Sequence, residues 1–263
     1  MIKLIITDMD GTLLSDKKEI DPSFWGMHQQ LMDRGIVFSV ASGRQIYSLE
    51  ATFADIKQGT LFIAENGTYV RYNGEDVYLN SLDTTYLPQI IETARQLEGA
   101  EIVLCCKNSA YVEQSDPAFV KEIGKYYHHL EVVDDLNKVE DTALKVAIYH
   151  VIGAENRIYP AFSAFKNAYN LTISGPEWLD ITNITANKGT AVERAQKKLG
   201  ILKEETMAFG DFLNDMEMMQ AVGHSFAMKN AHPDIIKVSR YVTEKDNNNN
   251  GVVDTIQKKI IQI

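Results

Sequence analysis

The chain has 263 residues and a formal net charge of −10, which argues against a surface for nucleic acid or anionic membranes, because such surfaces need clustered Lys and Arg. Its 45% of apolar residues can bury a full core, and its length favours two domains over one. The two cysteines are adjacent, which indicates neither a disulfide framework nor a metal site. With no signal pattern before the first strand and no apolar run near the ~20 residues of a membrane span, we expect a cytoplasmic protein that contacts no membrane.

The chain begins with an apolar, β-branched run, Lys3–Thr7, that ends in Asp8 and Asp10. Such a run predicts a buried strand, and Gly11 allows the chain to curl after it. Where a strand end curls into a loop, both carboxylates can converge on one point, and they need a cation to stay ionised there. Hard oxygen ligands of this kind suit Mg²⁺. Taken alone, the motif is equally compatible with an acidic turn that binds nothing.

The segment after this motif alternates between helix and strand. The predicted elements are a helix over 22–34, a strand over 36–41, a helix over 46–53, a strand over 60–64 and a hairpin that turns at Asn73-Gly74. Strands that alternate with helices at this spacing predict parallel βαβ units and a doubly wound sheet.

The pattern changes between about residues 83 and 182. It becomes helix, strand, strand, helix, strand, then a strand over 144–151, another helix, and two strands over 171–174 and 179–182. From Asn187 the alternation of strand and helix resumes. We therefore predict an α/β fold, a doubly wound, mostly parallel Rossmann-like sheet with an inserted α+β domain. The predicted core comprises residues 1–82 and 186–263, and the insertion comprises 83–185.

Further polar clusters follow other predicted elements. Ser42 ends a strand, Lys188 begins a helix, and Asp211 ends the strand Thr206–Gly210. Alone, each has a plain structural reading: a helix cap for Ser42, a surface lysine for Lys188 and a turn residue for Asp211. Together they favour a ligand site, because all of them fall outside the carboxyl ends of the strands, where open α/β sheets bind ligands.

The chain resembles the haloacid dehalogenase-like phosphohydrolase superfamily, in particular its Cof-type branch with a C2-type cap. The matching motifs are Asp8-Met9-Asp10-Gly11-Thr12, Ala41-Ser42-Gly43-Arg44, Asn66-Gly67, Asn187-Lys188-Gly189 and Gly210-Asp211 with Asn214-Asp215. They span nearly the whole chain, and their combination is far more specific than any one of them. The resemblance implies a Mg²⁺-dependent phosphatase for small phosphorylated metabolites, with sugar phosphates as the leading class. It also implies that the inserted domain is a cap that closes over the active site.

The same resemblance implies roles for the acidic residues. Asp8 would attack the phosphoryl group and form an aspartyl-phosphate. Asp10 would protonate the leaving oxygen and then deprotonate the attacking water. Asp8, Asp211 and the main-chain carbonyl of Asp10 would bind Mg²⁺, and Asp215 would support the metal.

A second group of residues would bind the phosphate. Ser42 and Lys188 offer a hydroxyl and a positive charge to its oxygens. By resemblance, the further donors are the backbone N–H groups of Met9 and Gly43 and the amide of Asn214. Thr12 is expected to orient Asp10. Arg44 is expected either to reach the substrate or to pair with an acid, and Asn187 to cap the helix that Lys188 begins.

Two other functions remain open at this point. A phosphomutase would use the same nucleophile but return the phosphoryl group to the substrate. A non-catalytic binding protein on this fold is disfavoured, because Asp8, Asp10 and Asp211 are all present. The sequence predicts neither the physiological substrate nor the oligomeric state.

Overall fold

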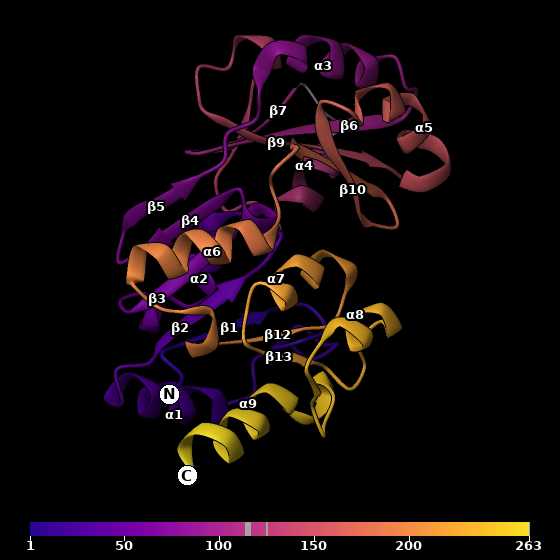
Figure 1. Ribbon diagram of the computed structural model, residues 1–263. Coiled ribbons are helices and arrows are strands. Elements are labelled where there is room, and N and C mark those ends of the chain that lie inside the picture. The colour runs from indigo at the N-terminus through magenta and orange to yellow at the C-terminus, as the bar shows by residue number, and fades with distance from the viewer. Residues whose placement is uncertain (114–116, 125, 263) are drawn as a thin grey trace. The chain divides into compact units, whose positions relative to one another are not determined.

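The computed structural model describes residues 1–113, 117–124 and 126–262. It divides into two compact units (Figure 1). The first unit comprises Met1–Ser42, Thr52–Tyr78 and Asn187–Ile263, and the second comprises Gly43–Ala51 and Leu79–Ala186. Among the described residues, no helix is long and apolar enough to cross a membrane.

The first unit is built on an eight-stranded sheet. Its strands are β1 (Leu4–Asp8), β2 (Val37–Ala41), β3 (Thr60–Ala64), β4 (Tyr69–Tyr72), β5 (Glu75–Leu79), β12 (Thr206–Gly210), β13 (His224–Ala227) and β14 (Tyr241–Val242). Their spatial order is β14-β13-β12-β1-β2-β3-β4-β5. The six strands from β14 to β3 are parallel, and β4 runs antiparallel to β3. The predicted mostly parallel sheet is therefore confirmed.

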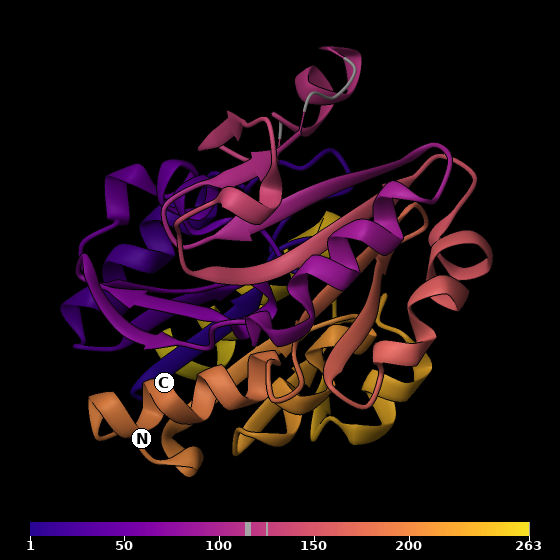
Figure 2. The ribbon, with the colours of Figure 1, turned by 90° about the horizontal axis from the view of Figure 1, so that it is seen from above.

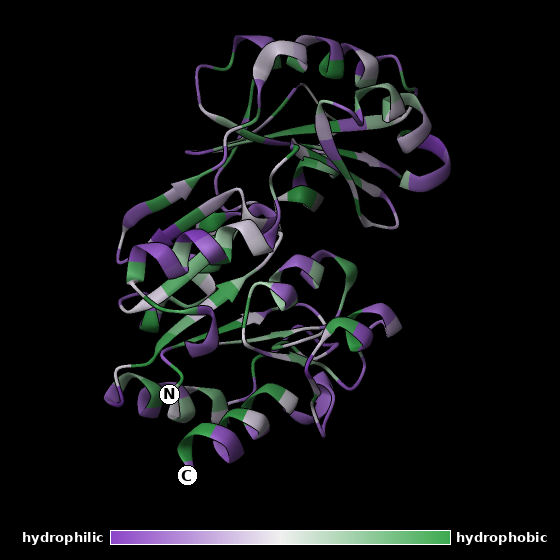
Figure 3. Ribbon diagram, in the orientation of Figure 1, coloured by the Kyte–Doolittle hydropathy of each residue, from purple (hydrophilic) through white to green (hydrophobic). Residues whose placement is uncertain are grey.

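Helices cover both faces of this sheet. They are α1 (Ser23–Asp33), α6 (Lys188–Leu199), α7 (Met216–Gln220), α8 (Pro233–Val238) and α9 (Gly251–Ile256). Helix α1 packs on β2 and meets α9, whereas α6 packs on β3 and meets α7, and Figure 1 shows these two pairs on opposite faces. A parallel strand covered on both faces is buried on both and is therefore mostly apolar. All five residues of β1 are accordingly buried, and Figure 3 shows the central strands largely in green.

The second unit is an α+β unit on a six-stranded sheet. Its strands are β6 (Ala100–Cys106), β7 (Ala110–Val112), β8 (Leu130–Val132), β9 (Ala143–His150), β10 (Tyr169–Gly175) and β11 (Trp178–Asn183), and its helices are α2 (Ile46–Thr52), α3 (Leu87–Arg95), α4 (Pro117–Ile123) and α5 (Tyr159–Phe162). The strand order is β10-β11-β9-β6-β7-β8, antiparallel except for the β7–β8 pair. Figure 2 shows α3 lying across this sheet. The predicted order of elements in the insertion is confirmed.

The segment Gly43–Ala51 belongs to the second unit, although it directly follows a strand of the first. The side-chain amide of Gln45 donates to the carbonyl of His129 at 2.9 Å and accepts from the N–H of His129 at 3.0 Å. Lys145 donates to the carbonyl of Gly43 at 3.5 Å. The prediction placed these residues in the Rossmann-like core domain, because a helix at this position continues the alternation of strand and helix. The insertion itself begins at Leu79 and ends at Ala186, close to the predicted limits of 83 and 185.

Candidate active site

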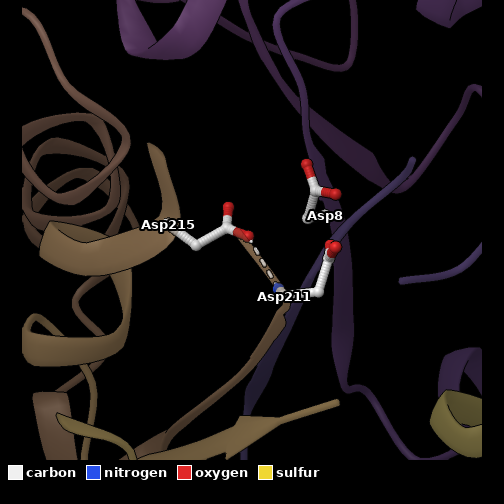
Figure 4. A group of neighbouring side chains, drawn as sticks. All are labelled: Asp8, Asp211 and Asp215. Carbon is white, nitrogen blue, oxygen red and sulfur yellow. Dashed lines mark hydrogen bonds between the residues drawn. The ribbon is translucent and has the colours of Figure 1, made fainter. Parts of the chain in front are cut away.

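Two of the predicted acids lie at the ends of neighbouring strands. Strand β1 pairs with β12 in parallel, with Thr7 beside Phe209. Asp8 and Asp211 therefore leave the sheet at the same edge. Asp215 joins them from the turn before α7, and Figure 4 shows the three carboxylates gathered together. Each of the three offers an oxygen within 4.8 Å of the others.

Asp215 is fixed by the backbone of the loop that carries Asp211. Its Oδ2 accepts hydrogen bonds from the N–H of Asp211 at 2.9 Å and of Phe212 at 3.2 Å, and the residue is fully buried. Gly210 makes this arrangement possible, because a Cβ at that position would lie 2.7 Å from the carboxyl carbon of Asp215. The Gly-Asp pair of the motif thus has a steric reason.

Lys188 contacts two of the three acids of this cluster. It is the first residue of α6, its exposed fraction is 0%, and its Nζ lies 2.5 Å from Asp8 Oδ1 and 2.7 Å from Asp215 Oδ1. This burial excludes the surface-lysine reading. Asn187 caps the helix, as predicted, because its side-chain oxygen accepts the N–H of Thr190 at 2.8 Å.

Close backbone contacts hold the start of α6 in place. A Cβ at Gly67 would lie 2.3 Å from the carbonyl oxygen of Asn187, and a Cβ at Gly189 would lie 2.5 Å from that of Glu217. No side chain fits at either position unless the backbone moves. Gly67 and Gly189 therefore let the start of α6 approach its neighbours closely enough to bring the ammonium of Lys188 to Asp8.

The cluster holds three carboxyl groups but one ammonium. Burial is the largest effect on Asp8 and raises its pKa well above the usual value; Lys188 opposes this effect, while Asp215 and Asp211 add to it. Burial also raises the pKa of Asp211 to about 6. For Lys188, burial would lower the pKa, but the nearby Asp215 and Asp8 outweigh it and the net shift is upward. Lys188 therefore carries its positive charge.

The donor set fits a hard divalent cation. Asp8, Asp211 and Asp215 all offer carboxylate oxygens, and one ammonium cannot balance three carboxylates in a buried site. Sulfur and imidazole ligands, which softer metals prefer, are absent from this group. The carboxylate of Asp10 is not part of the group; the ligand predicted from Asp10 is its main-chain carbonyl.

Thr12 has a different partner from the one expected. Its hydroxyl donates to Asp211 Oδ1 at 2.6 Å, so it orients a candidate metal ligand instead of Asp10. Asp10 itself forms an ion pair with Lys18, with Nζ and Oδ1 2.8 Å apart, and its side chain is 40% exposed. The sequence could not show the Thr12 contact, because 199 residues separate the two partners.

Asn66 links Ser42 and Asn214, although the sequence indicated it only as part of the Asn66-Gly67 motif. The N–H of Asn66 donates to the carbonyl of Ser42 at 3.0 Å, and its side-chain oxygen accepts from the amide of Asn214 at 3.1 Å. Asn66 has φ +54, a conformation that Asn tolerates better than most residues. The available signal in the sequence was an Asn-Gly pair one residue beyond the end of β3.

The remaining predicted phosphate ligands are not all placed by the structure. Met9 is fully buried between Asp8 and Asp10. Gly43 and Arg44 follow Ser42 in the chain but belong to the second unit, so their part in phosphate binding stays a prediction.

Comparison with known proteins identifies the family. A model of the haloacid dehalogenase-like hydrolases matches residues 5–256. The chain belongs to this family. This haloacid dehalogenase-like hydrolase is 35% identical to the Escherichia coli K12 5-amino-6-(5-phospho-D-ribitylamino)uracil phosphatase YbjI, over 98% of this chain and 96% of that protein.

Two further matches extend over most of the chain. The HMP-PP phosphatase of Serratia proteamaculans is 25% identical, over 89% of this chain and 86% of that protein. The crystal structure of SMU.1108c from Streptococcus mutans UA159 superimposes with a TM-score of 0.88 at 27% identity, covering 99% of this chain and all of that one. The resemblance on which the sequence analysis relied is thereby confirmed.

The charge of the cluster predicts how metal binding depends on pH. A metal binds the ionised carboxylates, so protons compete with it once the pH falls through the raised pKa of Asp211, about 6. The affinity for Mg²⁺ should then fall at least tenfold per pH unit below about pH 6, since each proton displaced enters the binding equilibrium. Calorimetric titration of the protein with Mg²⁺ over this range measures it. An affinity that is the same at about pH 7 and about pH 5 would contradict the prediction.

Proposed function

We propose that the protein is a Mg²⁺-dependent phosphatase that hydrolyses small phosphorylated metabolites, sugar phosphates foremost, through an aspartyl-phosphate on Asp8. One observation carries this proposal. The carboxylate of Asp8 stands at the end of the central strand β1, in contact with the buried ammonium of Lys188 and within 4.8 Å of a carboxylate oxygen of Asp211. A carboxylate attacks an anionic phosphoryl group only where the opposing charge is neutralised and the line of attack is fixed.

Mg²⁺ would be held by Asp8 and Asp211, with Asp215 in support and the main-chain carbonyl of Asp10 as the further ligand that the family resemblance implies. When bound, it supplies positive charge to the phosphoryl oxygens and fixes their orientation. Lys188, in contact with Asp8, supplies a second positive charge, and its contact with Asp215 holds it in place.

The chain's own residues account for two chemical steps. In the first, Asp8 forms a bond to phosphorus while the bond from phosphorus to the leaving oxygen breaks and Asp10 protonates that oxygen. In the second, Asp10 takes a proton from water, which attacks the phosphorus and releases Asp8 and inorganic phosphate. Ser42, the amide of Asn214 and the N–H groups of Met9 and Gly43 would bind the phosphoryl oxygens. Thr12 keeps Asp211 oriented throughout.

The named relatives support a small substrate. One acts, by its name, on a phosphorylated ribityl compound, and the other is named an HMP-PP phosphatase. In the first of these, the phosphate is carried by a sugar-alcohol chain, which agrees with sugar phosphates as the leading class. The role of the second unit as a cap that contacts the substrate is part of the same proposal.

The direct test is a screen of phosphorylated metabolites with Mg²⁺, in which released inorganic phosphate is measured and substrates are ranked by kcat/KM. A phosphatase releases one phosphate per substrate consumed. A phosphomutase instead yields an isomer of the substrate without net phosphate release, and that result would replace the proposal with the alternative function. Absence of turnover on every compound would favour a binding protein.

Replacement of Asp8 tests its role as the nucleophile. Asp8→Asn keeps the side-chain volume but removes the attacking charge, so kcat should fall by ~10⁴-fold or more, as for other essential catalytic groups. The measurement is steady-state turnover on the best substrate, with circular dichroism to verify the fold. Asp55→Asn, at an exposed acid outside the site, serves as the matched control and should keep wild-type activity. Retention of a tenth of wild-type kcat by Asp8→Asn would rule out covalent catalysis there.

Replacement of Asp10 tests its role as the general acid and base. An alkoxide leaving from a sugar phosphate needs a proton in the transition state, whereas a phenolate of low pKa does not. Asp10→Asn should therefore lose far more activity on the alkyl ester than on the aryl ester. On the aryl ester, the missing base should slow the second step, giving a burst of phenol followed by a slow steady state. Rapid-mixing measurements check both; equal losses without a burst would show that the proton comes from another group.

A further inference from the structure

A run of four asparagines, Asn247–Asn250, precedes helix α9 and has one buried member. Asn247 is 4% exposed, whereas Asn248 and Asn249 are exposed. The turn that holds the run is tight, because a Cβ at Gly251 would lie 2.2 Å from the carbonyl oxygen of Lys245. A buried amide costs free energy unless its hydrogen bonds are made, so the partners of Asn247 indicate what it does.

Both amide hydrogens of Asn247 go to the loop that follows Asp10. Its Nδ2 donates to the carbonyl of Leu14 at 3.0 Å and to Asp16 Oδ1 at 3.0 Å. Asn248 strengthens the second contact, since its amide donates to Asp16 Oδ2 at 3.0 Å. The two asparagines lie more than 230 residues from Leu14 and Asp16 in the chain.

A second asparagine holds the other end of the same loop. Asn230 donates to the carbonyl of Gly11 at 2.8 Å, and its side-chain oxygen accepts the N–H of Asn247 at 3.2 Å. The two amides therefore bind the backbone at both Gly11 and Leu14. We call Asn230 and Asn247 the asparagine clamp and residues Gly11–Asp16 the clamped loop.

The clamped loop lies between the two members of the Asp10–Lys18 ion pair. Leu14 forms a bridge with the backbone of Asp10, and Lys18 contacts the Asp10 carboxylate at 2.8 Å. The Asp10 side chain is 40% exposed, so surrounding side chains confine it less than they confine the buried Asp8. The position of its carboxyl group therefore depends on the backbone that carries it.

We propose that the asparagine clamp positions Asp10 for proton transfer by fixing the clamped loop; this rests on the proposed function. Asn247 and Asn230 are positioning residues, since they contact the backbone and Asp16. An amide is required because the carbonyls of Leu14 and Gly11 need donors. A carboxylate at position 247 would offer none and would repel Asp16. A shift of a catalytic group by about 1 Å costs on the order of 10²-fold in rate.

The test compares two phosphate esters, one with an alkyl and one with a low-pKa phenolic leaving group. Asn247→Asp should lower kcat on the alkyl ester by roughly 10- to 100-fold and on the aryl ester by much less, reproducing the pattern of Asp10→Asn. Loss of stability alone would lower both rates equally. Asn249→Asp is the matched control, because it makes the same substitution in the same run and Asn249 donates to Asp246 of its own loop. It should leave the ratio of the two rates unchanged.

Two further variants keep the test decisive. If Asn247→Asp does not fold, Asn230→Ala replaces it, since Asn230 is exposed and the substitution removes its hydrogen bonds with Asn247 and Gly11. In the Asp10→Asn background, Asn247→Asp should add no further change to the alkyl-to-aryl ratio, because two residues that act through one group are not additive.

The outcomes separate the clamp from the proposed function. A wild-type protein that hydrolyses neither ester rejects the proposed function and the clamp with it. The clamp alone is rejected if the wild type and Asp10→Asn behave as predicted but a folded Asn247→Asp variant keeps the wild-type ratio of alkyl to aryl rates. The clamp is also rejected if the control Asn249→Asp shifts this ratio as strongly as Asn247→Asp does.

Discussion

The structure depends on an imbalance of charge in a buried site. Asp8, Asp211 and Asp215 converge within 4.8 Å, and Lys188, fully buried, contacts two of them. Each supporting feature brings these charges together or holds them. The β1–β12 pairing aligns two of the acids, the glycines beside Lys188 admit its helix, and backbone N–H groups bind Asp215. Without a cation, the repulsion among these carboxylates is unfavourable, but the close packing holds them in place. Such a cluster is well suited to bind a metal and an anionic substrate together.

Asp8 and Asp10 are two residues apart but lie in opposite environments. Asp8 is 6% exposed and contacts Lys188, whereas the Asp10 side chain is 40% exposed and contacts Lys18. Carboxylates that share a site can take different chemical roles when their surroundings differ. A buried carboxylate held by a fixed ammonium suits a nucleophile. A carboxylate on a loop suits a group that must reach a leaving oxygen and then a water, provided that the loop itself is held.

The sequence predicted the parallel sheet, the order of elements in the insertion and the edge at which the polar residues gather. These features follow from local periodicity and from the position of polar residues at strand ends. It could not predict which distant side chains meet. The hydroxyl of Thr12 reaches Asp211, and the amide of Asn247 reaches Leu14, because the order of the strands places their loops together. The sequence also could not predict that Gly43–Ala51 belongs to the second unit, because this depends on hydrogen bonds with the distant residues His129 and Lys145.

The most direct test of the charge imbalance is the stability of Asp211→Asn with and without Mg²⁺. Raising the pKa of Asp211 from 3.8 to about 6 means that the folded state holds the ionised form at a cost of ~1.4 kcal/mol per pKa unit at neutral pH. Asn removes this charge and can still accept the hydrogen bond of Thr12. Chemical denaturation should therefore show a metal-free variant about 1–3 kcal/mol more stable than the metal-free wild type, and Mg²⁺ should stabilise only the wild type. A metal-free variant that is less stable than the wild type, or that Mg²⁺ stabilises equally, would contradict the account.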